Sequence, residues 1–126
     1  MGKTKYLDVG ASDHSRVRFK EGAGEYQVES WLLKKLTALD CLYWKFVSPG
    51  TSGVPDRIVV LPTGDVFFVE LKRDSGVISA IQMYRREQLI SHNARHRFVR
   101  GMSGAEEFVK EVEDVIRSKG IPVPRN

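Results

Sequence analysis

Two apolar runs on either side of a short polar turn constrain the fold of this chain more than any other feature. Residues 59–61 read VVL and residues 66–71 read VFFVEL, with PTGD between them. Runs of this composition predict β-strands, and their continuity predicts strands that are buried on both faces. Because the intervening turn is short, the two strands should pair as an antiparallel hairpin.

Three polar side chains lie where this hairpin begins and ends. Asp56 precedes the first run, whereas Glu70 and Lys72 finish the second. Successive residues of a strand point to opposite faces, so Glu70 and Lys72 share one face and Leu71 points to the other. Charged pairs are common on a solvent-exposed face. At the ends of buried strands they are rare without a further role.

The length of the turn decides whether the two carboxylates meet. With a two-residue turn, Asp56 falls opposite Leu71, and the carboxylates point to opposite faces. With a three-residue loop at 62–64, Asp56 falls opposite Glu70, and Gly64 supplies the left-handed residue that such loops need. Cross-strand partners have Cβ atoms roughly 5 Å apart, which is close enough for both carboxylates to bind one ion. A β-bulge would change this register.

The residue types at this site point to a hard metal ion and a phosphate. Oxygen ligands without Cys or His favour Mg²⁺ or Mn²⁺ over Zn²⁺. Such an ion can acidify a water molecule and neutralise charge on a phosphoryl oxygen. Lys72 is placed beside Glu70 to stabilise the transition state or to assist the attacking water. We interpret the hairpin as a metal site that cleaves a phosphodiester.

Three amphipathic segments predict helices around the hairpin. The first begins near residue 25, and the second runs from Ser79 to about His92. The third opens at a capping-box signature, Ser103 to Glu106, and ends before Gly120. The apolar residues that we expect in the core are Val28, Leu32, Leu36, Leu39, Ile81, Tyr84, Leu89, Phe108, Val109, Val112 and Ile116.

Two further segments predict strands and complete the order αβββαβα: residues 41–47, which are rich in aromatic and β-favouring side chains, and residues 95–100 (RHRFVR), whose charge favours the edge of the sheet. The last strand follows a helix, so it should lie parallel to its neighbour after a right-handed crossover. The expected fold class is therefore α/β, with helices on both faces of a mixed sheet. We divide the chain into a basic N-terminal arm (1–24), a central domain (25–119) and a tail (120–126).

Charge and cysteine content limit the setting and the partners. The chain of 126 residues has a net charge of +4, which favours a polyanionic partner. Cys41 is the only cysteine, so no disulfide can form within the chain, and a reducing, cytoplasmic setting is expected. No apolar run has membrane-spanning length, and the first residues do not resemble a signal peptide.

The combined motifs resemble a known nuclease family. GVPDR at 53–57, VELKR at 69–73 and then Gln82 are similar to the signature of VRR-NUC nucleases, a branch of the PD-(D/E)XK superfamily. The resemblance covers about residues 29–99 and is closest to the small stand-alone form found in phages. It implies a restriction-endonuclease-like core.

The resemblance also implies roles for the residues of the hairpin. Asp56 and Glu70 would bind Mg²⁺ or Mn²⁺ together with the backbone carbonyl of Leu71. Lys72 would be the catalytic lysine. No small-molecule cofactor is expected.

Two residues outside the hairpin have competing interpretations. Glu29 borders the apolar stripe of the first helix, where an unpaired carboxylate is costly. It would reach water, pair with a lysine or, as the resemblance implies, approach the metal ion. Gln82 matches a glutamine that contacts metal-bound water or DNA. However, its S-x-x-Q spacing from Ser79 also predicts a capping box, and both roles can hold.

Basic and hydroxyl side chains near the hairpin are candidate DNA contacts. Arg57 could bind the cleaved strand or a carboxylate. The other candidates are Lys45, Ser48, Arg73 and Arg85. Together with Arg86, Arg95, Arg97 and Arg100, the basic residues could form a surface that follows the phosphates, although Arg85 and Arg86 could equally lie on a solvated helix face.

These features lead to one main expectation and two alternatives. We expect a metal-dependent, structure-specific DNA endonuclease, acting on branched DNA such as four-way (Holliday) junctions during phage replication or recombination in a bacterial cell. Paired cuts at a junction imply a homodimer. One alternative is a non-catalytic nucleic-acid-binding module, and the other is a restriction-type nuclease acting on linear duplex DNA.

Overall fold

The computed structural model describes residues 24–124, so the predicted basic arm lies outside the described residues except for Gly24. The predicted order αβββαβα is confirmed. The elements are α1 (Glu25–Ala38), β1 (Leu42–Lys45), β2 (Arg57–Val60), β3 (Val66–Lys72), α2 (Ala80–Ser91), β4 (Arg95–Arg100) and α3 (Gly101–Ser118).

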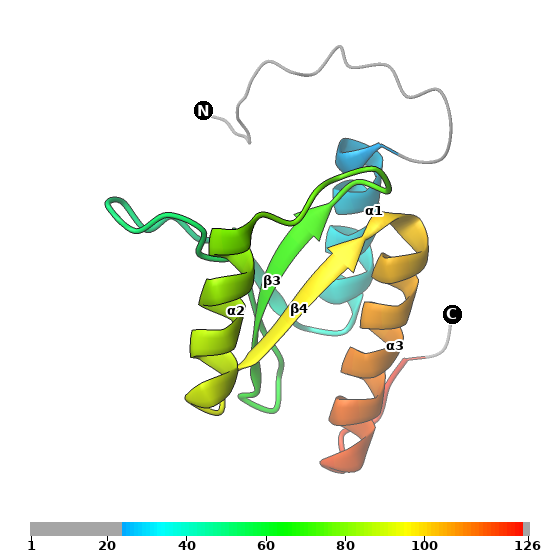
Figure 1. The fold of residues 1–126 in the computed structure, drawn as a ribbon. Helices are drawn as coiled ribbons and strands as arrows, with labels where there is room; N and C mark the ends of the chain where they lie inside the picture. The colour runs from blue at the N-terminus through cyan, green and yellow to red at the C-terminus, as the bar shows by residue number, and fades with distance from the viewer. Residues whose placement is uncertain (1–23, 125–126) are drawn as a thin grey trace.

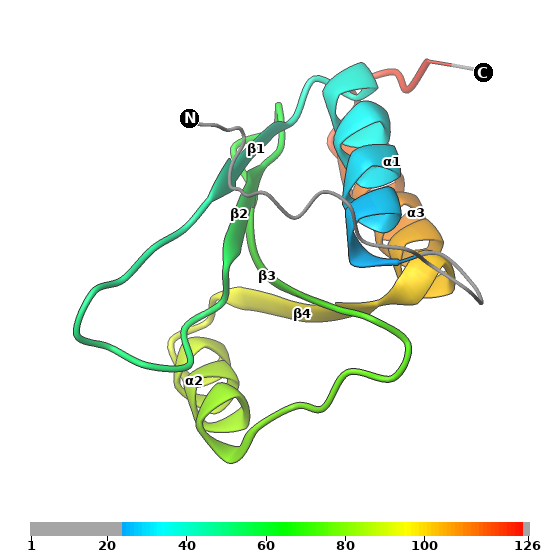
Figure 2. The ribbon, with the colours of Figure 1, turned by 90° about the horizontal axis from the view of Figure 1, so that it is seen from above.

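The strands form one mixed sheet in the order β1-β2-β3-β4. The first three strands are antiparallel, and β4 lies parallel to β3, as the helical crossover predicts. Helices α1 and α3 cover one face of the sheet and α2 lies against the other (Figures 1 and 2). The sheet therefore has a face toward α1 and α3 and a face toward α2.

The hairpin has the three-residue loop that brings the carboxylates together. Val60 pairs with Val66, and the Leu61 N–H donates to the Asp65 carbonyl at 2.9 Å. Gly64 adopts a positive φ of 92°, which a residue with a Cβ rarely tolerates. The predicted register is thus confirmed.

The main core lies between the sheet and the pair α1 and α3. The predicted stripes of both helices are buried there, together with alternate residues of β2 and β3. On the opposite face of these strands Glu70 is buried, but the apolar side chains are half-buried or exposed, so the prediction that the apolar runs are buried on both faces is wrong. The core residues of the hairpin are Val59, Leu61, Phe67, Val69 and Leu71.

Helix α2 differs from the prediction because it covers its face of the sheet loosely. None of its residues is buried. Ile81 is 39% exposed and Tyr84 is 51% exposed, whereas Leu89 is half-buried. The expected core positions of Ile81 and Tyr84 are therefore wrong, because α2 borders a more polar face than α1 and α3 do.

Helix α3 begins two residues before its predicted start. Arg100 ends β4, and Gly101 begins the helix at a φ of 63°. A Cβ on Gly101 would lie 1.9 Å from Asp74 Oδ1, so the strand turns into the helix at a position that only glycine fits. Ser103 is consequently inside the helix, and its predicted capping box is wrong.

Within residues 24–124, none of the helices combines the length and the apolar character needed to span a membrane.

Candidate active site

Asp56 and Glu70 meet at the end of the hairpin farthest from its loop. Extending the register of β2 and β3 places them opposite each other, on the face toward α2. The Leu71 N–H also donates to Asp56 Oδ1 at 3.4 Å, which ties the Asp56 carboxylate to the second strand. The Leu71 side chain points into the core, as the alternation predicts.

Burial and mutual repulsion make this carboxylate pair difficult to ionise. Burial, followed by the charge of Asp56, raises the pKa of Glu70 to about 7. Burial also raises the pKa of Asp56, although Arg57 and the Leu71 N–H partly oppose that change. Two desolvated acids that face each other favour an added cation. Their geometry therefore suits a metal site better than a structural ion pair.

The Lys72 ammonium lies on the same face and is held in position. Its Nζ is 4.0 Å from Glu70 Oε2 and donates to the Val77 carbonyl at 2.9 Å. The loop containing Val77 connects β3 to α2 across the end of the sheet (Figure 1). Arg100 fixes this loop, because its Nη1 donates to the carbonyls of Arg73, Asp74 and Gly76 at 3.2, 3.1 and 2.6 Å.

Gln82 caps α2, as its spacing from Ser79 predicts, and it also contacts an acid of the site. The Ser79 N–H donates to Gln82 Oε1 at 3.0 Å, and the Gln82 N–H donates to Ser79 Oγ at 3.2 Å, so the capping box is confirmed. The Gln82 amide Nε2 also donates to Glu70 Oε2 at 3.1 Å. Gln82 thus belongs to the site, and its contact with water or DNA remains a prediction.

Glu29 reaches the site from α1, but an arginine holds it. Arg57 Nε donates to Glu29 Oε2 at 2.6 Å, and the Tyr43 hydroxyl donates to the same oxygen at 3.1 Å. Arg57 also donates to the Asp56 carbonyl at 2.9 Å, and its Nη1 is 3.5 Å from Asp56 Oδ2. Of the two partners considered for Arg57, the structure shows the carboxylate. The sequence contained no signal that marked Tyr43.

A divalent ion fits the oxygen atoms that the site offers. In the described part of the chain, no three His, Cys, Asp or Glu side chains gather closely enough to hold a metal ion by themselves. However, Mg²⁺ is commonly bound by one or two carboxylates, with water and substrate phosphate completing its shell. Asp56, Glu70 and the Leu71 carbonyl match that donor set.

An apolar pocket of about 330 Å³ lies beside the acid pair. It is enclosed by α2, by β3 and by the loop between β1 and β2. Phe46, Phe68 and Leu89 form part of its wall, and Pro55 lines it immediately before the first acid of the pair. Phe68 is two residues before Glu70 and therefore shares its face of β3. The pocket and the acid pair therefore lie on the same face of the sheet.

Two predicted DNA contacts, Ser48 and Arg85, line this pocket together. Arg85 also fixes the pocket's outer loop, because its Nε donates to the Ser52 carbonyl at 2.8 Å. In the same loop, Gly53 packs so closely on α2 that a Cβ would lie 2.9 Å from the Ile81 carbonyl carbon. The loop therefore lies directly against α2 at Gly53 and is held there by the Arg85 side chain.

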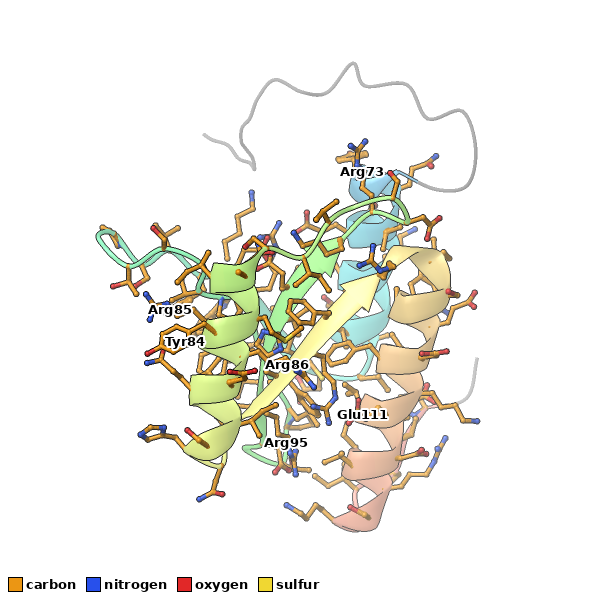
Figure 3. All side chains as sticks on the ribbon, in the orientation of Figure 1. Arg73, Tyr84, Arg85, Arg86, Arg95 and Glu111 are labelled. Atoms are coloured by element: carbon orange, nitrogen blue, oxygen red, sulfur yellow. The ribbon has the colours of Figure 1, made fainter. Side chains whose placement is uncertain are left out.

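The other predicted contacts do not form one basic surface. Lys45 and Arg73 are exposed. Figure 3 shows Arg73 and Arg95 at opposite ends of the molecule. Arg95 lies 3.2 Å from Asp65 Oδ1, and Arg97 Nε donates to Glu111 at 2.9 Å. The predicted continuous surface is wrong, because these guanidinium groups neutralise acids within the fold.

Arg86 and Arg100 are engaged in the same way. Arg86 Nη1 donates to the His96 carbonyl at 3.0 Å, and Arg100 binds the three carbonyl groups described above. Arg86 is therefore not simply part of a solvated helix face. The DNA contacts expected for Lys45, Arg73 and Arg85 remain predictions.

Comparisons with known proteins point to nucleases. A protein named "Putative nuclease p44", from Acyrthosiphon pisum secondary endosymbiont phage 1, is 46% identical over 48 residues, or 38% of this chain and 52% of that protein. The chain thus spans about half the length of this relative. A solved structure of a VRR_NUC domain matches with a TM-score of 0.62 and 28% identity, over 68% of this chain and 94% of that one. No family model matches the chain.

The mixed sheet with its flanking helices has the restriction-endonuclease-like fold. Fold and sequence together support a nuclease. More particularly, they support a nuclease of the VRR-NUC type, so the resemblance seen in GVPDR and VELKR is confirmed.

Proposed function

We propose that this protein is a Mg²⁺- or Mn²⁺-dependent endonuclease that hydrolyses phosphodiester bonds in DNA. The observation that carries the proposal is the facing pair Asp56 and Glu70, with Lys72 beside it on the same face. Raised pKa values of both acids support a site that needs a cation. We assign this activity to residues 25–119.

The ion would be held by Asp56, Glu70 and the Leu71 carbonyl. When bound, it supplies a Lewis acid that polarises a phosphoryl oxygen and lowers the pKa of water. Glu29 does not contact Asp56 directly. Arg57 lies between them and binds both carboxylates.

Lys72 and Gln82 supply the remaining polar groups. The Lys72 ammonium stabilises negative charge that develops on the phosphoryl group, and the Val77 carbonyl keeps its Nζ in place. Gln82 orients Glu70 through the 3.1 Å hydrogen bond and brings the first turn of α2 to the site. Arg85 and Ser48, at the adjoining pocket, would contact the DNA backbone.

We further propose branched DNA, such as a four-way junction, as the substrate, with a homodimer supplying two cuts. We place this activity in phage replication or recombination inside a bacterial cell, and the phage source of the relative named a nuclease is consistent with that setting. The net charge of +4 is consistent with DNA as the partner.

Cleavage of defined DNA structures tests the proposal. Labelled four-way junctions, flaps and linear duplexes are incubated with the protein and Mg²⁺ or Mn²⁺. We expect cutting of the junction that disappears in EDTA and in Lys72→Ala. Lys119→Ala is the matched control, because Lys119 binds Asp65 at the far end of β3, and it should cut normally.

Other outcomes identify the alternatives. Tight binding without cutting in either metal contradicts the proposed activity and indicates a binding module. Equal cutting of linear duplex and junction contradicts the structure-specific substrate and favours a restriction-type nuclease. Sedimentation of the protein alone tests the dimer, and a monomer at all concentrations would contradict paired cutting.

A further inference from the structure

Arg57 lies between two carboxylates that belong to different layers of the fold. Its Nε is 2.6 Å from Glu29 Oε2 on α1, and its Nη1 is 3.5 Å from Asp56 Oδ2 at the start of β2. Only 8% of the residue is exposed. The Tyr43 hydroxyl donates to the same oxygen of Glu29, which fixes the carboxylate that Arg57 binds. The guanidinium is thus held from both sides.

The position of this guanidinium matters for the number of ions that the site can bind. Nucleases that use two metal ions hold them roughly 3.5–4 Å apart, with carboxylates between and around them. Here Glu29 and Asp56 would be available for a second ion if Arg57 were absent. The guanidinium remains charged at every physiological pH, and a cation that displaced it would leave the Arg57 charge buried and unpaired.

We infer that Arg57 is a positioning residue that serves as a built-in second positive charge, so that the site binds a single divalent ion between Asp56 and Glu70. This inference rests on the proposed function.

The count of charged side chains at the site agrees with a single ion. Three carboxylates, Glu29, Asp56 and Glu70, face the side-chain cations of Arg57 and Lys72. One negative charge remains, which one divalent ion more than neutralises.

Arg57 would also orient Asp56 directly. It binds the backbone carbonyl and the carboxylate of the same residue, so it restricts both the chain and the side chain at the first ligand. Tyr43 and Glu29 act one step farther away by holding the guanidinium. None of these three side chains needs to contact DNA.

The number of bound Mn²⁺ ions tests the inference without relying on cleavage. Calorimetric titration of the full chain with Mn²⁺ should give one ion per chain for the native protein and two for Arg57→Ala, in which Glu29 and Asp56 become available. Arg57→Lys keeps the positive charge and should again bind one ion. Arg95→Ala is the matched control, because it removes an arginine paired with an acid at the far end of β3.

The activity of the variants separates positioning from DNA binding. The single-turnover rate of Arg57→Ala should fall about 10- to 100-fold, as for other residues that orient metal ligands. Its affinity for junction DNA should change by less than about 3-fold, because the side chain is buried. A loss of DNA affinity as large as the loss of rate would overturn the positioning role.

The variant Arg57→Gln keeps the test valid if Arg57→Ala does not fold. Its amide can still donate a hydrogen bond to Glu29 while the positive charge is lost, so it should bind two ions. Two ions in the native protein, or one ion in a folded Arg57→Ala, would overturn the inference while leaving the proposed nuclease intact. No Mn²⁺ binding by the native protein would overturn both.

Discussion

Strand β3 has an acidic residue near each end, and the two acids lie in opposite electrostatic surroundings. Asp65, just before the strand, accepts a hydrogen bond from Thr63 and pairs with Lys119 at 3.1 Å and Arg95 at 3.2 Å. The Thr63 hydroxyl and then Lys119 lower the pKa of Asp65. Glu70, near the other end, has a pKa raised to about 7 by burial and by a second carboxylate.

The difference separates a structural acid from a functional one. Asp65 fastens the hairpin loop to α3, and its charge is balanced by neighbouring cations. Glu70 lacks this balance, since its nearest cation is 4.0 Å away and its repulsive partner is fixed opposite it. Proteins keep such unfavourable pairs chiefly where a bound ion or a reaction needs them.

The contrast between Glu70 and Asp65 should be largest in the rate of DNA cleavage. Glu70→Gln should lower the single-turnover rate of DNA cleavage about 10³-fold, because it removes charge from the proposed ligand pair. Asp65→Asn is an equally small change at the other end of β3. After correction for the fraction of the variant that is folded, its cleavage rate should stay within about 3-fold of the native rate. Similar losses of cleavage rate in the two variants would contradict the distinction between a functional Glu70 and a structural Asp65.

The same two variants should change stability in opposite directions. The raised pKa means that the folded state binds the Glu70 proton more tightly than the unfolded state does. The stability that this proton adds is fully present below pH 4.5 and is lost as the pH rises through about 7. Glu70→Gln should therefore raise the free energy of unfolding at pH 8, by roughly 2–3 kcal/mol. Asp65 has a lowered pKa, so Asp65→Asn should reduce stability at neutral pH.

Chemical denaturation from pH 4 to pH 8 without metal measures both effects. Adding Mn²⁺ should stabilise the native protein more at pH 8 than at pH 5, because protons compete with the ion for Glu70. An unfolding free energy that rises between pH 5 and pH 8 in the metal-free native protein would contradict the raised pKa of Glu70.

A smaller effect separates the two functions of Gln82. Ser79→Ala and Gln82→Ala both break the capping box and should each lower stability by about 1 kcal/mol. Only Gln82→Ala also removes the hydrogen bond to Glu70, so it alone should slow cleavage, by about 10-fold. Equal rates in the two variants would assign Gln82 to the helix alone.

The hairpin was predictable because its determinants are local. The loop length and Gly64 fixed the register, and the alternation along β3 placed Glu70 and Lys72 on one face. The S-x-x-Q spacing identified the start of α2 for the same reason. Each of these inferences depends on residues that are close in sequence.

Partners that are distant in sequence were not predictable. Glu29 was recognised as a carboxylate that needed a partner, but its partners Arg57 and Tyr43 come from two different strands. The arginines expected on one surface are instead paired with acids or carbonyl groups, which depends on how the helices pack. The start of α3 was missed because a close approach of Asp74 requires glycine at residue 101.

The contact between Gly53 and α2 offers a route to redesign. The outer loop of the pocket is held on α2 by the close packing of Gly53 against Ile81 and by the hydrogen bond from Arg85 to Ser52, not by Phe46 or Leu89. Phe46 and Leu89 can therefore be exchanged for smaller or larger residues to remodel the pocket's interior beside an unchanged acid pair. A library at these two positions could alter substrate preference while leaving the cleavage chemistry in place.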